Sequence, residues 1–114
     1  MLATGELITP ADAGYDAARK IWNGAIDRRP AVIARCRETA DVAAALRLAR
    51  ERQLPLAVRG GGHGVAGSAV VDGGLVIDLS PMKAIAVDPE ARTARAQGGV
   101  LWGELDAATQ AHGL

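Results

Sequence analysis

Apolar residues along the chain alternate between short continuous runs and blocks with helical spacing. The run AVIA at 31–34 is typical of a short buried strand. From Thr39 onward, apolar residues recur at helical spacing as far as the Leu-Pro pair at 54–55, and Thr39 is a candidate N-cap, which predicts a helix over 39–53. A second apolar run at 56–58 predicts another strand. This strand–helix–strand succession is typical of a βαβ unit with a right-handed crossover.

The remaining segments comprise a weak helical start and a region of short strands. Residues 11–22 have helical spacing that Gly14 weakens. Beyond a central glycine-rich segment, short apolar runs bounded by turn residues predict strands at 69–71, 75–79, 84–87 and 93–97, and a last block predicts a helix over 100–111. The pattern therefore changes at the glycines from a βαβ succession to a succession of short strands.

Composition and charge narrow the class of protein. The 114 residues carry 13 basic and 13 acidic side chains, so the net charge of zero provides no reason to expect nucleic acid or a membrane as a partner. Hydrophobic residues make up 49%, too many for a disordered chain. The single cysteine excludes an intramolecular disulfide and a multi-cysteine metal site. The length allows one domain at most. Because the chain has neither a secretory signal nor an apolar span, we expect a cytoplasmic protein.

The most unusual segment is rich in glycine and directly follows the strand predicted at 56–58. Seven of the 14 glycines fall within 60–74, and the stretch RGGGHGVAGS occupies 59–68. Consecutive glycines allow positive φ and remove every Cβ, so backbone N–H groups can converge on an anion. Pyrophosphate is the usual anion that needs so long a cradle. His63, at the centre of the segment, either hydrogen-bonds the loop backbone or lies beside a bound cofactor.

The same segment contains Gly62-x-Gly64-x-x-Gly67, the dinucleotide fingerprint of Rossmann folds. That fingerprint has to open a helix whose N-terminus holds the pyrophosphate. The stretch between Gly62 and the next predicted strand is too short for a crossover helix. No Lys-Ser or Lys-Thr follows the glycines, which excludes a Walker A site. An NAD-binding Rossmann domain is therefore the weaker alternative, and a helix beginning at Gly64 would support it.

Segments on both sides of the glycines complete a pattern that one family shares. They are WNG at 22–24, RPAVI at 29–33, RGGGHG at 59–64, GLVIDLS at 74–80, VDP at 87–89, ARAQGG at 94–99 and WGELD at 102–106. Together these segments resemble the FAD-binding domain of the berberine-bridge-enzyme-like oxidases, within the vanillyl-alcohol-oxidase/PCMH flavoprotein superfamily. The resemblance covers most of the chain, and it is specific because the segments occur together.

The resemblance implies a site for FAD, extended between two α+β subdomains with the glycine loop around its pyrophosphate. It implies that His63 bonds covalently to the 8α-methyl carbon of the flavin, as a tether and not as a catalytic base. Arg59 would either compensate the pyrophosphate charge or be a surface residue at the end of a strand. The other cofactor-binding residues would act through backbone N–H groups or, for the serine, a hydroxyl; they are Gly60, Gly61, Gly62, Gly64, Gly67 and Ser68.

Three further residues have structural interpretations. Cys36 follows a predicted strand and is expected in the core; it lies too early in the chain to be the cysteine that holds flavin in some family members. Asp78 ends an apolar strand and is expected to be a turn or capping residue. His112 is expected at an exposed helix end.

We therefore predict an α+β fold, a PCMH-type FAD-binding domain with an N-terminal βαβ subdomain and the start of a second, sheet-rich subdomain. Residues 1–27 would form a helical lead-in and 28–114 the domain, incomplete at its C-terminus. The full-length protein is expected to oxidise a C–H next to oxygen or nitrogen in an alcohol, sugar or amine, by hydride transfer to covalent FAD. An electron acceptor such as molecular oxygen would complete the reaction. The alternative is a non-catalytic fragment that binds FAD or a nucleotide.

Overall fold

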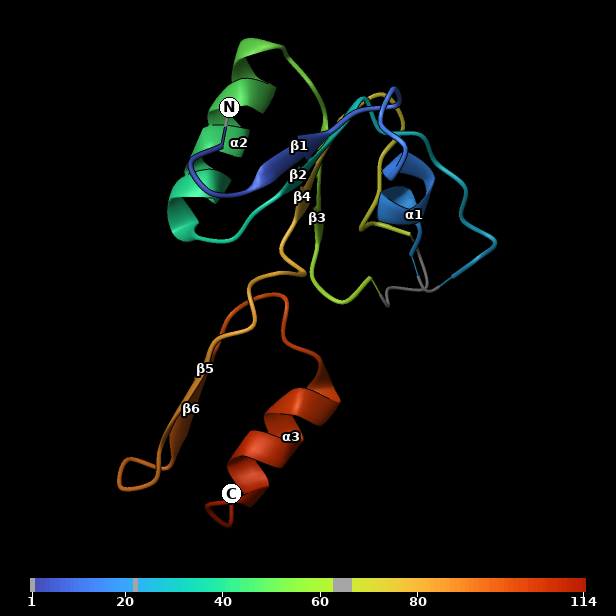
Figure 1. Cartoon of the computed structure of the whole chain (residues 1–114). Helices are drawn as coiled ribbons and strands as arrows, with labels where there is room; N and C mark the ends of the chain where they lie inside the picture. The colour runs from blue at the N-terminus through green and yellow to red at the C-terminus, as the bar shows by residue number, and fades with distance from the viewer. Residues whose placement is uncertain (1, 22, 63–66) are drawn as a thin grey trace.

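A computed structural model describes residues 2–21, 23–62 and 67–114, and its main feature is a four-stranded sheet with the strand order β1-β2-β4-β3 (Figure 1). The strands are β1 (Glu6–Ile8), β2 (Val32–Arg35), β3 (Leu56–Arg59) and β4 (Leu75–Asp78). Strand β4 pairs in parallel with both β2 and β3, whereas β1 pairs antiparallel with β2. The three parallel strands therefore end at one common edge of the sheet.

Helix α2 (Thr39–Glu51) connects β2 to β3 and covers one face of the sheet (Figure 1). Side chains at alternate strand positions, such as Ala34 and Ile77, pack against Ala45 and Ala49 of this helix. The predicted βαβ succession is confirmed, although β4 lies between the two strands that the helix joins.

The opposite face of the sheet packs against the N-terminal segment. Ile33 and Val76 contact Tyr15, and the Tyr15 hydroxyl donates to the Pro30 carbonyl at 2.7 Å. The helix predicted over 11–22 is wrong in extent, because only α1 (Tyr15–Arg19) forms within it and the backbone of Lys20 is extended. Trp22 lies outside the described residues. The sequence patterns did not predict β1, whose three residues form a strand by pairing with β2.

The strand predicted at 69–71 is also wrong, because Ala69 lies in a turn and Val70 and Val71 are irregular. Strand β4 already has a partner on each side, so no position beside it is free for another strand. Val70 is nevertheless buried, 3% exposed, and packs with Ile33 and Val76. Its apolar character therefore serves the core and not a sheet.

The last third of the chain forms a separate arm below the sheet (Figure 1). Strands β5 (Ile85–Asp88) and β6 (Thr93–Ala96) make an antiparallel hairpin, and helix α3 (Trp102–Gln110) packs beside β5. We call β1–β4 with α1 and α2 the sheet lobe, and β5, β6 and α3 the C-terminal arm. Together they confirm the α+β class; the boundary at residue 28 stays a prediction.

Candidate functional site

The glycine-rich segment leaves the sheet at the edge where the parallel strands end. Gly60 directly follows β3, and the Arg59 carbonyl accepts a hydrogen bond from the N–H of Leu79, just after β4, at 2.8 Å. In open α/β sheets this carboxyl-end edge is where ligands bind. Of the predicted cofactor-binding residues, His63 and Gly64 lie outside the described residues, and the structure places the other six.

Glycine is required at two described positions of this loop. A Cβ on Gly60 would lie 2.6 Å from the Gly98 carbonyl oxygen, so the loop backbone is in direct contact with the segment that joins β6 to α3. Gly62 has φ +73°, in the left-handed region that side chains disfavour, and it is buried. The contact at Gly60 therefore fixes the loop against the chain after β6, and the positive φ at Gly62 is a conformation that lets backbone N–H groups converge on an anion.

Gly61, between these two glycines, is exposed and borders a cavity of about 570 Å³. The opposite wall is the start of α3, residues 100–104. Trp102 on this wall is 80% exposed, so an aromatic surface lies open beside the glycine backbone. Backbone donors next to an aromatic and aliphatic wall suit a ligand with both a phosphate and a ring system.

Glu104 is the acidic residue among those that form this wall. Its carboxylate accepts the N–H of Leu101 at 2.8 Å and the ammonium of Lys83 at 2.9 Å. These two donors, the backbone bond first, lower the pKa of the Glu104 carboxyl. The negative charge is therefore paired with a cation, and the N–H of Leu101, the N-cap residue of α3, is bound within the protein itself.

Arg59 at the end of β3 reaches back toward α1 instead of pointing into solvent. Its Nη1 donates to the Ala18 carbonyl at 2.8 Å, and its Nε is buried without a hydrogen-bond partner. The guanidinium lies directly below the loop, because a Cβ on Gly62 would be 3.1 Å from Arg59 Nε. The positive charge thus lies beside the glycine backbone.

Asp78, at the end of β4, faces Arg35 and Arg59 in register across the sheet edge. Its carboxylate is 2% exposed, accepts the N–H of Ser80 at 2.9 Å, and lies 3.5 Å from Arg35 Nε. The expected turn role is therefore correct, but the patterns missed the charge cluster. The cluster could have been predicted from the sequence, because each of these three charged residues ends a parallel strand and such ends meet at one edge of the sheet.

The remaining predicted residues lie as follows. Ser68 is exposed and Gly67 is buried with φ +78°. Cys36 is fully buried, as expected, and burial together with the charges of Asp41 and Asp78 raises the pKa of its thiol to about 11. His112 is exposed just beyond α3, which also agrees with the sequence.

Two features of the described residues argue against other classes of site. Residues 67–74 contain turns and irregular backbone but no helix, which removes the structural context that a Rossmann fingerprint needs. Among residues 2–21, 23–62 and 67–114 no three His, Cys, Asp or Glu side chains gather as metal ligands, and no helix there is long and apolar enough to cross a membrane.

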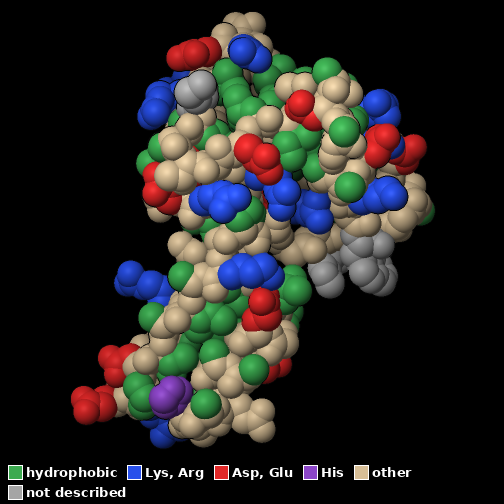
Figure 2. All heavy atoms as spheres, in the orientation of Figure 1, with side chains coloured by type: hydrophobic (Ala, Val, Ile, Leu, Met, Phe, Trp, Pro, Cys, Tyr) green, Lys and Arg blue, Asp and Glu red, His purple; other side chains and the backbone are tan. Residues whose placement is uncertain are grey.

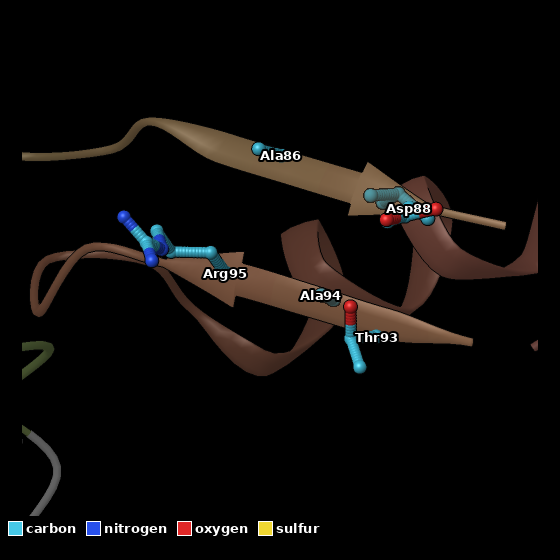
Figure 3. A pocket seen from close by; sticks show the side chains of 6 residues that line it. Ala86, Asp88, Thr93, Ala94 and Arg95 are labelled. Carbon is cyan, nitrogen blue, oxygen red and sulfur yellow. The ribbon is translucent and has the colours of Figure 1, made fainter. Parts of the chain in front are cut away.

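A separate hollow of about 370 Å³ lies on the β5–β6 hairpin (Figure 3). Arg95 lies toward one end of it, and Asp88 and Thr93 lie toward the other (Figure 3). These side chains are spread along two exposed strands and do not converge on a common point. The cavity beside Gly61 is therefore the better candidate site.

Comparison with known proteins points to the same part of the chain. A family model described as an FAD binding domain matches residues 30–114. The (R)-6-hydroxynicotine oxidase of Paenarthrobacter nicotinovorans is 46% identical over 101 residues, which are 89% of this chain and 22% of that protein.

Two solved structures superpose closely on the chain. The crystal structure of 6-hydroxy-D-nicotine oxidase from Arthrobacter nicotinovorans has a TM-score of 0.92 and 42% identity, over 99% of this chain and 26% of that one. Glucooligosaccharide oxidase from Acremonium strictum, described with a 6-S-cysteinyl, 8α-N1-histidyl FAD, has a TM-score of 0.83 and 31% identity, over 96% and 23%. The chain thus spans about a quarter of the length of these relatives.

Proposed function

The chain belongs to the FAD-binding domain family, and from this premise we propose that it forms the cofactor-binding part of an oxidoreductase that oxidises a C–H next to oxygen or nitrogen. The substrate would be a small alcohol, sugar or amine, and the final electron acceptor a molecule such as oxygen. FAD supplies the hydride acceptor when it is bound. Because the chain spans about a quarter of its relatives, substrate binding and proton transfer are assigned to the rest of the protein.

The observation that carries this proposal is the open glycine backbone at the carboxyl edge of the parallel strands. Gly61 borders the cavity whose other wall includes Trp102, and Arg59 adds a positive charge beneath the loop. We assign the pyrophosphate to the backbone N–H groups of residues 60–62 and 64, with Gly67 and Ser68 at the far side of the loop. The apolar wall of the cavity suits a ring of the cofactor.

We further propose that His63 is the covalent tether of the flavin. The residue lies outside the described part of the chain, so the support comes from two other observations. It stands at the centre of the glycine segment in the sequence. A structural relative with 31% identity is described with a histidyl link to the 8α position of FAD. A neutral imidazole nitrogen between glycines would meet little steric hindrance on approaching the flavin.

The decisive measurement is the intact mass, under denaturing conditions, of the protein as its natural source makes it. We expect a chain heavier than 11.7 kDa that retains one FAD adduct after acid denaturation. A His63→Ala variant of that protein should release its flavin into the acid supernatant. The matched control is His112→Ala, which changes the other histidine, exposed and remote from the glycine segment.

The possible results separate the parts of the proposal. Flavin that is fully released from the natural protein would overturn the tether but not FAD binding. Flavin that stays bound after acid treatment of His63→Ala would assign the link to another residue. A chain of 11.7 kDa without flavin would favour the non-catalytic fragment and overturn the proposed oxidoreductase.

A further inference from the structure

The segment through which the glycine loop returns to the sheet is packed against residues that precede the matched family region. Gly67 is buried with φ +78°, and a Cβ there would lie 2.9 Å from the Ile26 side chain. The backbone of the returning loop therefore lies directly on Ile26. Residues 67–74 form no helix or strand, so the course of the loop depends on contacts such as this one and on the packing of Val70 against the sheet.

Arg28 provides the strongest of these contacts. Its Nη1 donates to the Gly67 carbonyl at 2.7 Å and to the Val70 carbonyl at 3.1 Å. Hydrogen bonds from a charged donor are stronger than neutral ones, and the half-buried position of Arg28 limits competition from water. One guanidinium thus joins two carbonyls of the returning loop.

Arg28 is itself held in place by its neighbours. Arg19 donates to the Arg28 carbonyl at 3.1 Å, and the Arg19 guanidinium is paired with Asp16 and Asp27. Next in the chain, the N–H of Arg29 donates to Asp72 at 2.6 Å. The backbone around Arg28 is therefore fixed to α1 on one side and to the returning loop on the other.

The outgoing side of the glycine loop is fastened to the same segment. Arg59 donates to the Ala18 carbonyl and lies against Gly62. In the sequence, His63 stands between the two fastened stretches, Arg59–Gly62 and Gly67–Val70. The family match begins at residue 30, so each side of the loop is fastened to a residue that precedes the match, Ala18 on the outgoing side and Arg28 on the returning side.

We propose that Arg28 is a positioning residue for FAD, holding the returning side of the glycine loop so that His63 meets the flavin. This inference rests on the proposed function. The inference also means that residues before position 30 help to position the loop that binds the cofactor.

The test compares flavin attachment to flavin-free full-length protein supplied with FAD. The variants are Arg28→Met, Arg28→Gln and Arg28→Lys, with Arg47→Met on the exposed face of α2 as the matched control. We expect Arg28→Met and Arg28→Gln to slow covalent attachment about tenfold or more, because each loses both charge-assisted hydrogen bonds to the loop carbonyls. Arg28→Lys should recover part of the rate, and Arg47→Met should attach flavin as the unchanged protein does.

A second measurement does not depend on FAD. Amide hydrogen exchange within residues 67–74 of the flavin-free protein should be faster in Arg28→Met, with no change in α2. If Arg28→Met does not fold, Arg28→Gln takes its place in both measurements. Attachment and exchange at unchanged rates in the folded Arg28 variants would overturn the inference. If no protein takes up FAD but exchange responds as expected, the proposed function fails and the loop-holding role of Arg28 stands.

Discussion

The sheet lobe and the C-terminal arm bury their side chains to very different degrees. In the sheet lobe, Ile33, Ala34 and Leu75 are completely buried between α2 on one face and α1 on the other. In the C-terminal arm, no residue of α3 is buried and every residue of β6 is exposed. Figure 2 shows hydrophobic side chains open along the arm. The lobe has a core of its own, whereas the arm depends on its attachment to the lobe.

The C-terminal arm is joined to the sheet lobe through close contacts between backbone atoms. A Cβ on Gly99 would lie 2.0 Å from the Leu79 carbonyl oxygen, and the N–H of Gly99 donates to Met82 at 3.0 Å. The same junction contacts Gly60 of the glycine loop through Gly98. The candidate site therefore lies where the stable part of the chain meets the part with little core.

The largest expected effect is the loss of a core leucine in the lobe. Leu75→Ala should lower the free energy of unfolding by about 2–5 kcal/mol, because it leaves a cavity in a fully packed site. Leu105→Ala, at a half-buried position of α3, should cost less than about 1.5 kcal/mol. Urea unfolding followed by circular dichroism measures both variants. Equal losses would mean that the two regions are equally well packed.

A smaller effect is expected from two glycines of the junction and arm. Gly99→Ala should destabilise by about 1–3 kcal/mol, because the new methyl group has to displace the backbone at Leu79. Gly103→Ala should stabilise by about 0.5–1 kcal/mol, because Gly103 lies within α3 and nothing stands within 4 Å of its added Cβ. Thermal unfolding of the two variants checks the opposite signs. A destabilising Gly103→Ala would show that α3 is more tightly packed than described.

The smallest expected effect is a change in the pH dependence of stability at acidic pH. It concerns two carboxylates, Asp41 in the first turn of α2 and Glu104 in the first turn of α3. Burial would raise the pKa of Asp41, but the N–H of Arg37 and the N–H and hydroxyl of Thr4 outweigh it and lower that pKa to about 2. Glu104, by contrast, is exposed.

Because the pKa of Asp41 is lower in the folded than in the unfolded protein, its stabilisation is complete above the ordinary value of 3.8 and is lost as pH falls toward 2. Asp41→Asn should therefore be less stable than the unchanged protein at pH 6, with the difference shrinking below pH 4 (about the unfolded pKa). Glu104→Gln should change this profile less, because its carboxyl is exposed. Urea midpoints measured from pH 6 to pH 2.5 test the comparison; a constant difference for Asp41→Asn would contradict it.

Local patterns predicted the elements that depend on local interactions. Helix α2 forms where the apolar spacing predicts it and begins at Thr39. Its N-cap, however, is Glu38 and not Thr39. The carboxylate of Asp41 accepts the N–H of Arg37, just before the helix. Strands β2, β3, β4, β5 and β6 lie within a residue or two of their expected positions. The errors in strands fall at β1 and at 69–71, where strand formation depends on a distant partner. The helix predicted over 11–22 forms only at Tyr15–Arg19.

The family and the glycine-rich segment could be identified without any structure, because both depend on runs of consecutive residues. The sequence also indicated that Cys36 belongs to the core. The roles of Arg28 and Arg59 on the two sides of the loop become apparent only in the folded chain, because their carbonyl partners are distant in sequence. The separation is 39 to 42 residues for Arg28 and 41 for Arg59. A hydrogen bond between such distant positions leaves no local pattern in the sequence, because the residues next to an arginine do not indicate which remote carbonyl it will bind. The chain has to fold before the two ends of the loop can meet the segment that fastens them.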